Sequence, residues 1–328
     1  MHDFFKTLSG PSSKKPFPLL SFPGIQLLGI TGRDLIGSAE NQARCMKAVA
    51  ERFDCAASVS LMDLSVEAEA FGSTVRFSDG EVPTVTGAIV HSAEDARRLV
   101  VPPVGCARTG LCVEAISLAK ERISDRPLFA GAIGPFSLSG RLMDMTEIMV
   151  KCLMEPEQTH LVLEKATAFI SDYAAALKAA GADGLIIAEP AAGLLSPGVC
   201  ETFSSRYVSR IVETVQDDRF SVIYHNCGNT LPLLASILGI GARAYHFGDA
   251  VDIGEILKGM PPEMPVIGNL SPSLYLRNGT PDRVAAATRE MMHKAYGYAN
   301  YIPSTGCDIP PLSPLANIDA FMLAASLC

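Results

Sequence analysis

Short apolar runs rich in β-branched residues alternate along the chain with segments in which apolar residues recur at helical spacing. The apolar runs predict strands at residues 57–62, 127–133, 184–188, 220–224, 242–247, 265–268 and 298–302. The helical spacing predicts helices at residues 39–53, 93–99, 109–123, 141–153, 156–179, 199–216, 230–239, 252–258, 281–297 and 314–326. Two further runs, 74–77 and 84–90, flank the turn Ser78-Asp79-Gly80 and predict a hairpin.

Strands and helices alternate over the whole length with no linker rich in proline or serine, which indicates a parallel sheet. About eight such units in 328 residues match an α/β fold of the (β/α)8 TIM barrel type better than an open doubly wound sheet. No G-x-G-x-x-G motif opens any unit, which disfavours a dinucleotide-binding fold. We therefore expect a loose N-terminal arm over residues 1–15 and a single catalytic barrel domain over residues 16–328, which begins with an extended apolar segment at 18–30.

Charge and cysteine content exclude several classes of protein. The 27 Lys and Arg residues against 35 Asp and Glu residues give a net charge of −8, so we expect no nucleic-acid-binding surface. Nine cysteines, an odd number scattered along the chain, favour a reducing, cytoplasmic location over a secreted disulfide framework. No apolar run reaches the roughly 20 residues of a membrane span, so we expect no contact with a membrane.

Polar side chains follow most of the predicted strands at the point where each strand ends. They are Asp63, Glu189, His225, Cys227, Asp249, Asn269, Cys307 and Asp308. The strands of an α/β barrel end around one cavity, where such proteins carry their chemistry. We therefore expect these side chains to line one site, and the alternative for each of them is an ordinary loop or cap residue.

The stretch His225-Asn226-Cys227 predicts part of a metal site. In extended backbone the side chains of residues i and i+2 point the same way, so His225 and Cys227 can reach one ion. Imidazole and thiolate are ligands that zinc prefers, and Cys307 follows the last predicted strand in a loop punctuated by glycine and proline. Three protein ligands with one open position are the pattern of a catalytic zinc site. The alternative is a half-buried histidine and two packing cysteines.

A zinc ion held by two thiolates and one imidazole is a modest Lewis acid toward water. Such an ion is well suited to hold a substrate thiol as a thiolate at neutral pH. The thiolate is the competent nucleophile, and its natural reaction is displacement at an electrophilic carbon such as an activated methyl group. The three candidate ligands therefore favour methyl transfer to a small-molecule thiol.

Several other features receive a structural interpretation. We interpret the segment 131–137, with Gly134-Pro135 behind a predicted strand, as turn chemistry. Arg33 is interpreted as a partner in a surface salt bridge rather than as an anchor for an anionic substrate. The cysteines that we interpret as packing residues are Cys45, Cys55, Cys106, Cys112, Cys152 and Cys200.

Five segments carry a resemblance to a known family. They are Ser65–Gly72, His225–Thr230, Gly268–Pro272, Asn278–Pro281 and Gly306–Pro311. Together they resemble the uroporphyrinogen decarboxylase superfamily, and within it the zinc-dependent corrinoid methyltransferases typified by methylcobalamin:coenzyme M methyltransferases. The resemblance covers nearly the full length. Its specific part is the H-x-C-G-N stretch combined with G-C-D-I-P-P, whereas the glycine-asparagine element is shared by the whole superfamily.

The resemblance implies a (β/α)8 barrel whose Zn²⁺ is bound by the matching His225, Cys227 and Cys307, which are then the catalytic residues. The zinc ion would bind a thiol such as coenzyme M as a thiolate. This thiolate would attack the methyl group of a methylcorrinoid (methylcobalamin) co-substrate, which a separate corrinoid protein presents.

Four further side chains are expected to bind the substrate, because they stand at strand ends or in the matching segments. They are Glu189, Asn229, Asp249 and Asn269. Of these, Glu189 and Asp249 are also candidates for a fourth zinc ligand.

One departure from the superfamily distinguishes between its reactions. The resemblance implies that a decarboxylase would carry an arginine-rich segment near its N-terminus for the porphyrinogen carboxylates, whereas here no arginine precedes Arg33. This departure disfavours decarboxylation and leaves methyl transfer as the expected activity. The alternatives are a decarboxylase of the uroporphyrinogen type, methyl transfer to tetrahydrofolate, and a non-catalytic partner of a corrinoid protein.

Overall fold

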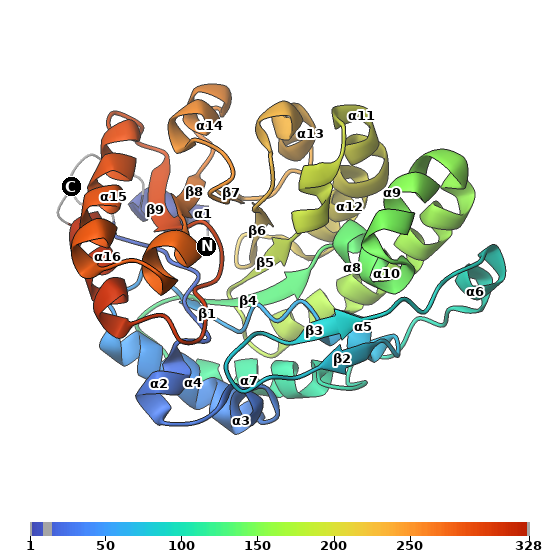
Figure 1. Ribbon diagram of the computed structural model, residues 1–328, viewed down its shortest axis with the longest axis horizontal. Helices are drawn as coiled ribbons and strands as arrows, with labels where there is room; N and C mark the ends of the chain where they lie inside the picture. Colours follow the sequence, from blue (N-terminus) through green and yellow to red (C-terminus); the bar gives the residue numbers. More distant parts are fainter. Residues whose placement is uncertain (1, 9–14, 327–328) are drawn as a thin grey trace.

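The computed structural model describes residues 2–8 and 15–326. Seven parallel strands form one curled sheet in the order β1-β4-β5-β6-β7-β8-β9 (Figure 1). These strands are β1 (Ser58–Val59), β4 (Leu128–Ile133), β5 (Gly184–Ala188), β6 (Ser221–Asn226), β7 (Ala244–Phe247), β8 (Val266–Leu270) and β9 (Tyr301–Thr305). The predicted hairpin is confirmed as an antiparallel pair, β2 (Thr74–Arg76) with β3 (Thr84–Thr86).

The helices surround the sheet (Figure 1). The α-helices are α1 (His2–Leu8), α2 (Gly24–Leu28), α3 (Gly32–Ile36), α4 (Ala39–Arg52), α5 (Val66–Ala70), α6 (Ala93–Arg98), α7 (Thr109–Arg122), α8 (Pro135–Met143), α9 (Met145–Met154), α10 (Pro156–Ala179), α11 (Pro197–Cys200), α12 (Arg206–Val215), α13 (Leu234–Leu238), α14 (Ile253–Gly259), α15 (Pro281–Lys294) and α16 (Leu315–Ser326). Short 3-10 or π segments are η1 (Pro190–Leu194), η2 (Glu201–Ser205), η3 (Leu231–Leu233) and η4 (Pro272–Arg277). In the described part of the chain, none of the helices is long and apolar enough to cross a membrane.

The extended segment 15–20 occupies the position between the two outermost strands of the sheet. The carbonyl of Pro16 accepts from Ala56 N–H at 2.8 Å, and Phe17 N–H donates to the carbonyl of Pro303 at 2.8 Å. Pro16 and Pro18 have no N–H, so the segment cannot form a regular ladder with either neighbour. The segment 15–20 nevertheless joins the β1 side of the sheet to β9. The predicted TIM barrel is thereby confirmed.

The interior of the barrel is apolar along most of its length. Its layer of aliphatic side chains includes Ile186, Ile223, Ala244, Ile267 and Ile302. Because side chains alternate between the faces of a strand, the residue two positions further on points into the same interior. On four of the strands that residue is polar: they are His225, His246, Asn269 and Ser304. A polar layer therefore lies at the carboxyl end of the barrel.

The expected loose arm is wrong for residues 2–8, which form helix α1. The side chain of Phe5 is 1% exposed and its ring lies 6.2 Å from the ring of Phe129, near the start of β4. Leu8 belongs to the same apolar cluster, so α1 covers the amino end of the barrel interior. Residues 9–14 of the expected arm lie outside the described residues.

Several boundaries differ from prediction: helix α2 lies within the expected extended segment 18–30, and β6 runs to Asn226 and so includes His225. Helix α8 begins at Pro135, where turn chemistry was expected, because proline is favoured at the first position of a helix and Gly134 precedes it in extended conformation. Strand β9 runs three residues later than predicted, so Cys307 lies two residues beyond its end. The polarity of Ser304 and Thr305 is typical of loop residues, but both side chains are buried in the strand.

The Phe5→Ala variant should lower the free energy of unfolding by about 3 kcal/mol, because it empties a filled space at the end of the barrel. Chemical denaturation of the full chain measures this change. The half-buried neighbour Phe4 supplies the control, and Phe4→Ala should cost about 1 kcal/mol. Equal stability of Phe5→Ala and the wild type would contradict the packing of α1 against the barrel.

Candidate metal centre

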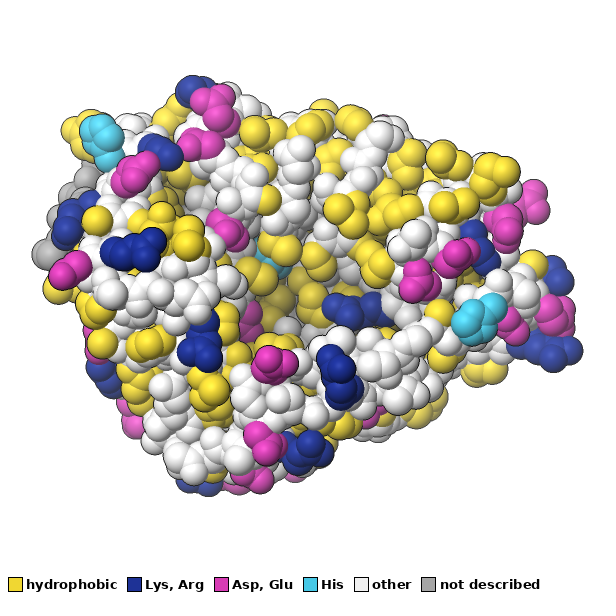
Figure 2. All heavy atoms as spheres, viewed as in Figure 1, with side chains coloured by type: hydrophobic (Ala, Val, Ile, Leu, Met, Phe, Trp, Pro, Cys, Tyr) yellow, Lys and Arg dark blue, Asp and Glu magenta, His cyan; other side chains and the backbone are white. Residues whose placement is uncertain are grey.

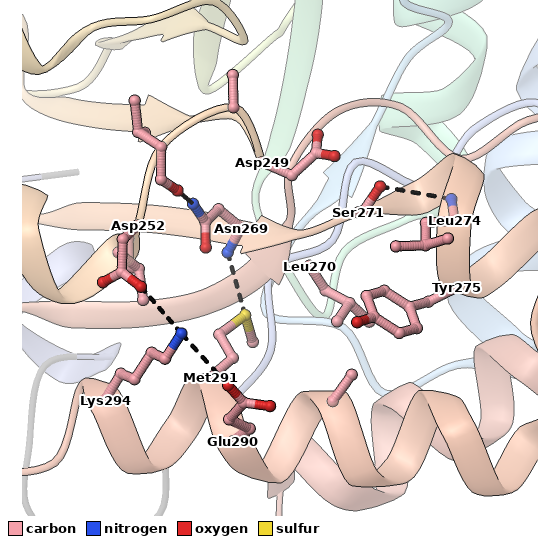
Figure 3. A pocket seen from close by; sticks show the side chains of 14 residues that line it. Asp249, Asp252, Asn269, Leu270, Ser271, Leu274, Tyr275, Glu290, Met291 and Lys294 are labelled. Atoms are coloured by element: carbon pink, nitrogen blue, oxygen red, sulfur yellow. Dashed lines mark hydrogen bonds and ion pairs between the residues drawn. The ribbon is translucent and has the colours of Figure 1, made fainter.

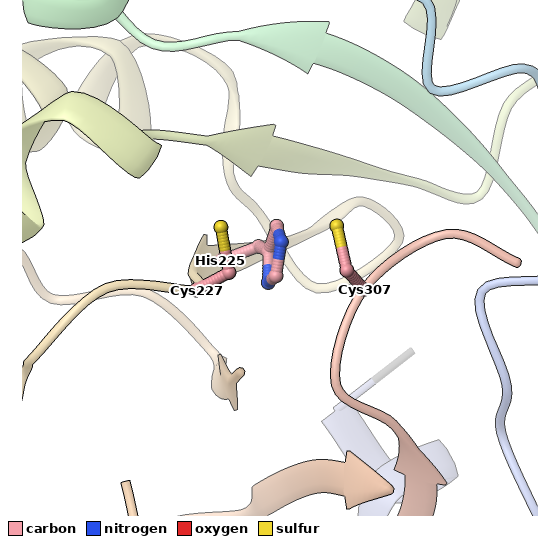
Figure 4. A group of neighbouring side chains, drawn as sticks. All are labelled: His225, Cys227 and Cys307. Carbon is pink, nitrogen blue, oxygen red and sulfur yellow. The ribbon is translucent and has the colours of Figure 1, made fainter. Parts of the chain in front are cut away.

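His225, Cys227 and Cys307 converge at the carboxyl end of the barrel (Figure 4). His225 lies within β6, Cys227 is the first residue after this strand, and Cys307 comes two residues after β9. One ligand atom from each side chain lies within 4.8 Å of the other two. The curvature of the sheet brings these residues together, since β7 and β8 lie between β6 and β9. Among the described residues, this is the group of His, Cys, Asp and Glu side chains that could hold a metal ion.

The separation of the three side chains fits a zinc ion. With Zn–S near 2.3 Å and Zn–N near 2.0–2.1 Å, tetrahedral ligand atoms lie roughly 3.5–3.8 Å apart. The three ligand atoms lie within 4.8 Å of one another, a limit that includes this spacing. One imidazole and two thiolates are also the ligand types that zinc prefers over magnesium or calcium.

The side chain of Asn226 holds the turn between the two ligands on β6. Its Oδ1 accepts from Gly228 N–H at 2.8 Å, and its Nδ2 donates to the carbonyl of Glu189 at 2.8 Å and to the hydroxyl of Tyr224 at 3.1 Å. Gly228 packs closely on Gly193, where an added Cβ would lie 2.8 Å from the Gly193 Cα. Asn226 thus fixes the backbone that carries Cys227, a role that the sequence interpretation did not assign.

The two thiols share one proton. Cys307 donates to the sulfur of Cys227, which lowers the pKa of Cys227, and the nearby His225 lowers it further against the opposing effect of burial. The same hydrogen bond, together with burial, raises the pKa of Cys307 well above its ordinary value. The Cys227 thiol therefore ionises more readily than the Cys307 thiol, and a metal ion that binds both sulfurs has to displace the proton of Cys307.

His246 is a neighbour of the candidate ligands that the sequence interpretation missed. It pairs in register with His225 across β6 and β7, and the two Nδ1 atoms are 2.8 Å apart. The ring centroids are 4.6 Å apart at an interplanar angle of 78°. Burial lowers the pKa of His246 well below its ordinary value, so this imidazole is neutral. Because His246 occupies Nδ1 of His225, Nε2 is the nitrogen left for a metal ion.

Glu189 caps a helix instead of pointing at the metal ligands. Its carboxylate accepts from the backbone N–H groups of Phe136 at 3.0 Å and Ser137 at 2.6 Å, at the N-terminus of α8. Ser204 Oγ donates to it as well, at 3.3 Å. An added Cβ on Gly134 would lie 2.5 Å from the carboxyl carbon, so this contact requires glycine there. The geometry is that of a fully buried N-terminal cap, and the expected roles of Glu189 as a substrate-binding group or fourth zinc ligand stay predictions.

Asn269 and Asp249 line a pocket of about 410 Å³, whose lining does not include the three candidate metal ligands (Figure 3). Asn269 Nδ2 donates to the carbonyls of Gly248 at 2.9 Å and Val251 at 2.8 Å, so this amide fastens the loop after β7. Asp249 is exposed, and its backbone nitrogen would lie 2.7 Å from a Cβ added to Gly306, the neighbour of Cys307.

Further along the wall of this pocket, Lys294 pairs with Asp252 at 2.9 Å and with Glu290 at 3.4 Å (Figure 3). Asn229 is exposed in the loop that follows Cys227, and it does not line this pocket. The expected substrate-binding roles of Asn229, Asp249 and Asn269 stay predictions.

The other polar strand-end residues have structural partners. Asp63 accepts from Arg108, whose Nε also donates to Glu69 at 2.6 Å. Asp308 accepts from Ser21 Oγ at 2.9 Å, which joins the loop after β9 to the N-terminal segment. Arg33 makes the expected exposed salt bridge with Asp79 at 3.4 Å.

A closed α/β barrel with an imidazole and two thiols at the carboxyl ends of its strands defines a barrel enzyme with a candidate zinc centre. The sequence model of the family described as Uroporphyrinogen decarboxylase (URO-D) matches residues 26–326, and the chain belongs to this family. The resemblance that the five segments predicted is thereby confirmed.

Relatives in this family include proteins named as methyltransferases and proteins named as decarboxylases. The methylcobamide:CoM methyltransferase MtbA of Methanosarcina acetivorans is 28% identical over 267 residues, which cover 80% of this chain and 77% of that protein. A uroporphyrinogen decarboxylase of Coxiella burnetii is 26% identical over 291 residues, which cover 83% and 77%. The expected relationship to methyltransferases is confirmed, and both names belong to enzymes.

Solved structures show the same fold. A methyltransferase from Methanosarcina mazei superposes with a TM-score of 0.87 at 22% identity, covering 98% of this chain and 96% of that one. A B12-independent methionine synthase from Shewanella sp. W3-18-1 gives a TM-score of 0.59 at 15% identity, covering 97% and 96%. The whole described chain is therefore one barrel of this type.

The chain should bind about one zinc ion, and Cys307→Ala should weaken zinc binding by more than about a hundredfold, because it removes one of three protein ligands. Competition with a chromophoric chelator measures the affinity. Cys152→Ala is the matched control, since Cys152 is buried in α9 and lies outside the cluster. Equal affinity in the two variants would contradict the assignment of Cys307 as a ligand.

Zinc affinity should rise with pH across the neutral range. The proton that zinc displaces is held by Cys307, whose pKa is raised, so lower proton concentration favours the metal. For one displaced proton the affinity changes by about tenfold per pH unit. Calorimetry in buffers of different ionisation enthalpy should show release of about one proton per zinc ion. An affinity that stays constant between about pH 6 and 8 contradicts the shared proton.

Proposed function

We propose that this protein transfers a methyl group from a methylated corrinoid to a small-molecule thiol, with Zn²⁺ held by His225, Cys227 and Cys307. The observation that carries the proposal is the convergence of these three side chains at the carboxyl end of a barrel of this family. Relatives named methylcobamide:CoM methyltransferases support a corrinoid donor and suggest coenzyme M as the acceptor.

His225, Cys227 and Cys307 would hold the zinc ion, and a site with three protein ligands would leave room for the acceptor sulfur. When bound, the zinc ion lowers the pKa of the acceptor thiol and keeps it as a nucleophilic thiolate at neutral pH. Asn226 holds the backbone turn that carries Cys227. In the metal-free protein the neighbouring Cys307 thiol lowers the pKa of Cys227, which favours the thiolate form that binds a metal ion. A sulfur-rich set of ligands favours a thiol acceptor over tetrahydrofolate.

The rim of the barrel suits an approaching corrinoid protein. Exposed leucines follow four of the strands at their carboxyl ends: Leu194, Leu231, Leu274 and Leu312. Hydrophobic side chains surround a hollow on the face shown in Figure 2. Apolar surface around a reactive centre is typical of a site that a partner covers. A separate corrinoid protein that presents its methyl group at this rim is therefore the partner that we propose.

Arg33 and Arg108 offer little free positive charge to a porphyrinogen, which carries many carboxylates. The segment 21–29 contains no lysine or arginine, and Arg33 is exposed and paired with Asp79. Arg108 is engaged by two carboxylates, those of Asp63 and Glu69. These pairings support methyl transfer over decarboxylation, although a uroporphyrinogen decarboxylase is among the relatives.

Zinc-loaded protein should convert free methylcobalamin to cob(I)alamin in the presence of a thiol such as coenzyme M, with a change in the visible absorbance. Cys307→Ala should lose activity by on the order of a hundredfold or more, because the ion that activates the thiol is lost. Cys152→Ala, the same substitution outside the cluster, should keep wild-type activity. Conversion with tetrahydrofolate but with no thiol would exclude the proposed acceptor class. Absence of any conversion, together with uroporphyrinogen decarboxylation, would exclude methyl transfer.

A further inference from the structure

A continuous chain of hydrogen bonds crosses the barrel interior from β6 to β9. It runs from Nδ1 of His225 to Nδ1 of His246 at 2.8 Å, and from Nε2 of His246 to Oγ of Ser304 at 3.0 Å. The hydroxyl of Ser304 then donates to the carbonyl of Thr305 at 3.1 Å. All three side chains of this chain are at most 2% exposed, so bulk water does not compete for these bonds.

The hydrogen bond from Ser304 to Thr305 sets the direction of donation in the other two hydrogen bonds. A carbonyl oxygen only accepts, so the Ser304 hydroxyl proton points to Thr305 and its lone pair faces His246. His246 Nε2–H therefore donates to Ser304, and the neutral ring has its lone pair at Nδ1. His225 Nδ1–H then donates to this lone pair, which leaves the lone pair of His225 at Nε2.

The opposite direction of donation along these hydrogen bonds would leave His225 without a lone pair for a metal ion. If His246 donated from Nδ1, His225 would accept at Nδ1 and carry its proton at Nε2. That tautomer has no lone pair to offer at the nitrogen left for the metal ion. The direction of donation in which Ser304 donates to the Thr305 carbonyl is therefore also the direction that leaves His225 Nε2 with a lone pair for a metal ion.

We propose that His246 and Ser304 are positioning residues that hold His225 as the Nδ1–H tautomer, with its Nε2 lone pair presented to zinc. The inference rests on the proposed function, since it concerns the same metal centre. The hydrogen-bond chain also joins β6, which carries His225 and leads to Cys227, to β9, which leads to Cys307. It therefore ties together the two parts of the barrel that supply the ligands.

Two variants of nearly equal shape separate an acceptor role from a packing role. Asparagine can place its Oδ1 where His246 has Nδ1 and accept from His225, whereas leucine has the same branching and no acceptor. Zinc affinity should fall by about 10- to 100-fold in His246→Leu and stay within about fivefold of the wild type in His246→Asn. If His246 only fills space, the leucine variant should bind zinc at least as tightly as the asparagine variant, which would overturn the inference.

Ser304→Ala removes one buried oxygen and keeps the rest of the chain. It should weaken zinc binding by about 3- to 10-fold, because either tautomer of His246 is then allowed. If His246→Leu does not fold, Ser304→Ala still tests whether the hydrogen-bond chain positions His225. Unchanged zinc affinity in Ser304→Ala overturns the proposal. Wild-type protein that binds no zinc contradicts the proposed function as well, whereas zinc bound equally by the wild type, His246→Leu and Ser304→Ala contradicts this inference alone.

Long-range nitrogen–proton NMR spectra of metal-free protein labelled at histidine report the tautomers directly. The expected spectrum shows a proton on Nδ1 of His225 and a proton on Nε2 of His246. A His246 ring protonated at Nδ1 would overturn the proposed direction of the chain.

Discussion

The aliphatic layer inside the barrel is the constraint on which the candidate site depends. Ile223, Ala244, Ile267 and Ile302 pack into one interior cluster, and this packing fixes which face of each strand points inward. The residue two positions further along must then point inward as well, so His225, His246, Asn269 and Ser304 form a polar layer above the aliphatic one. A slip of one residue in any of these strands would turn its polar side chain toward the helices. The site is therefore positioned by apolar packing below it, before any metal ion or substrate is involved.

Buried polar side chains hold the loops and turns around the candidate site. Asn226 shapes the turn to Cys227, Asn269 fastens the loop after β7, and Asp308 binds Ser21 next to Cys307. Glu189 holds the start of α8 and requires glycine at position 134. These buried polar groups have specific partners, as groups removed from water must have. The cluster is consequently a rigid centre, which favours the tight geometry that a metal ion demands.

Some of this arrangement could be predicted from the sequence. His225 and Cys227 were recognised because the alternation of a strand is local, and Cys307 because of its glycine- and proline-rich loop and its place in the resemblance. His246 could not be recognised, since its role arises from pairing with His225 across two strands and from a serine on a third. Glu189 stood at a strand end like a ligand, but its partners lie at the start of a helix that was interpreted as a turn. Helix α1 was missed because seven residues give too little periodicity to detect.

Binding of the acceptor thiol to the metal ion would distinguish a catalytic zinc site from a purely structural one, because only a catalytic ion takes up the sulfur of a substrate. The most direct test is zinc-edge X-ray absorption of the metal-loaded protein before and after addition of coenzyme M. The expected first shell contains two sulfurs and one imidazole nitrogen from the protein, and the thiol should add one further sulfur near 2.3 Å. A first shell that does not change when the thiol is added, in protein that has bound zinc at His225, Cys227 and Cys307, would contradict activation of a thiol at this centre.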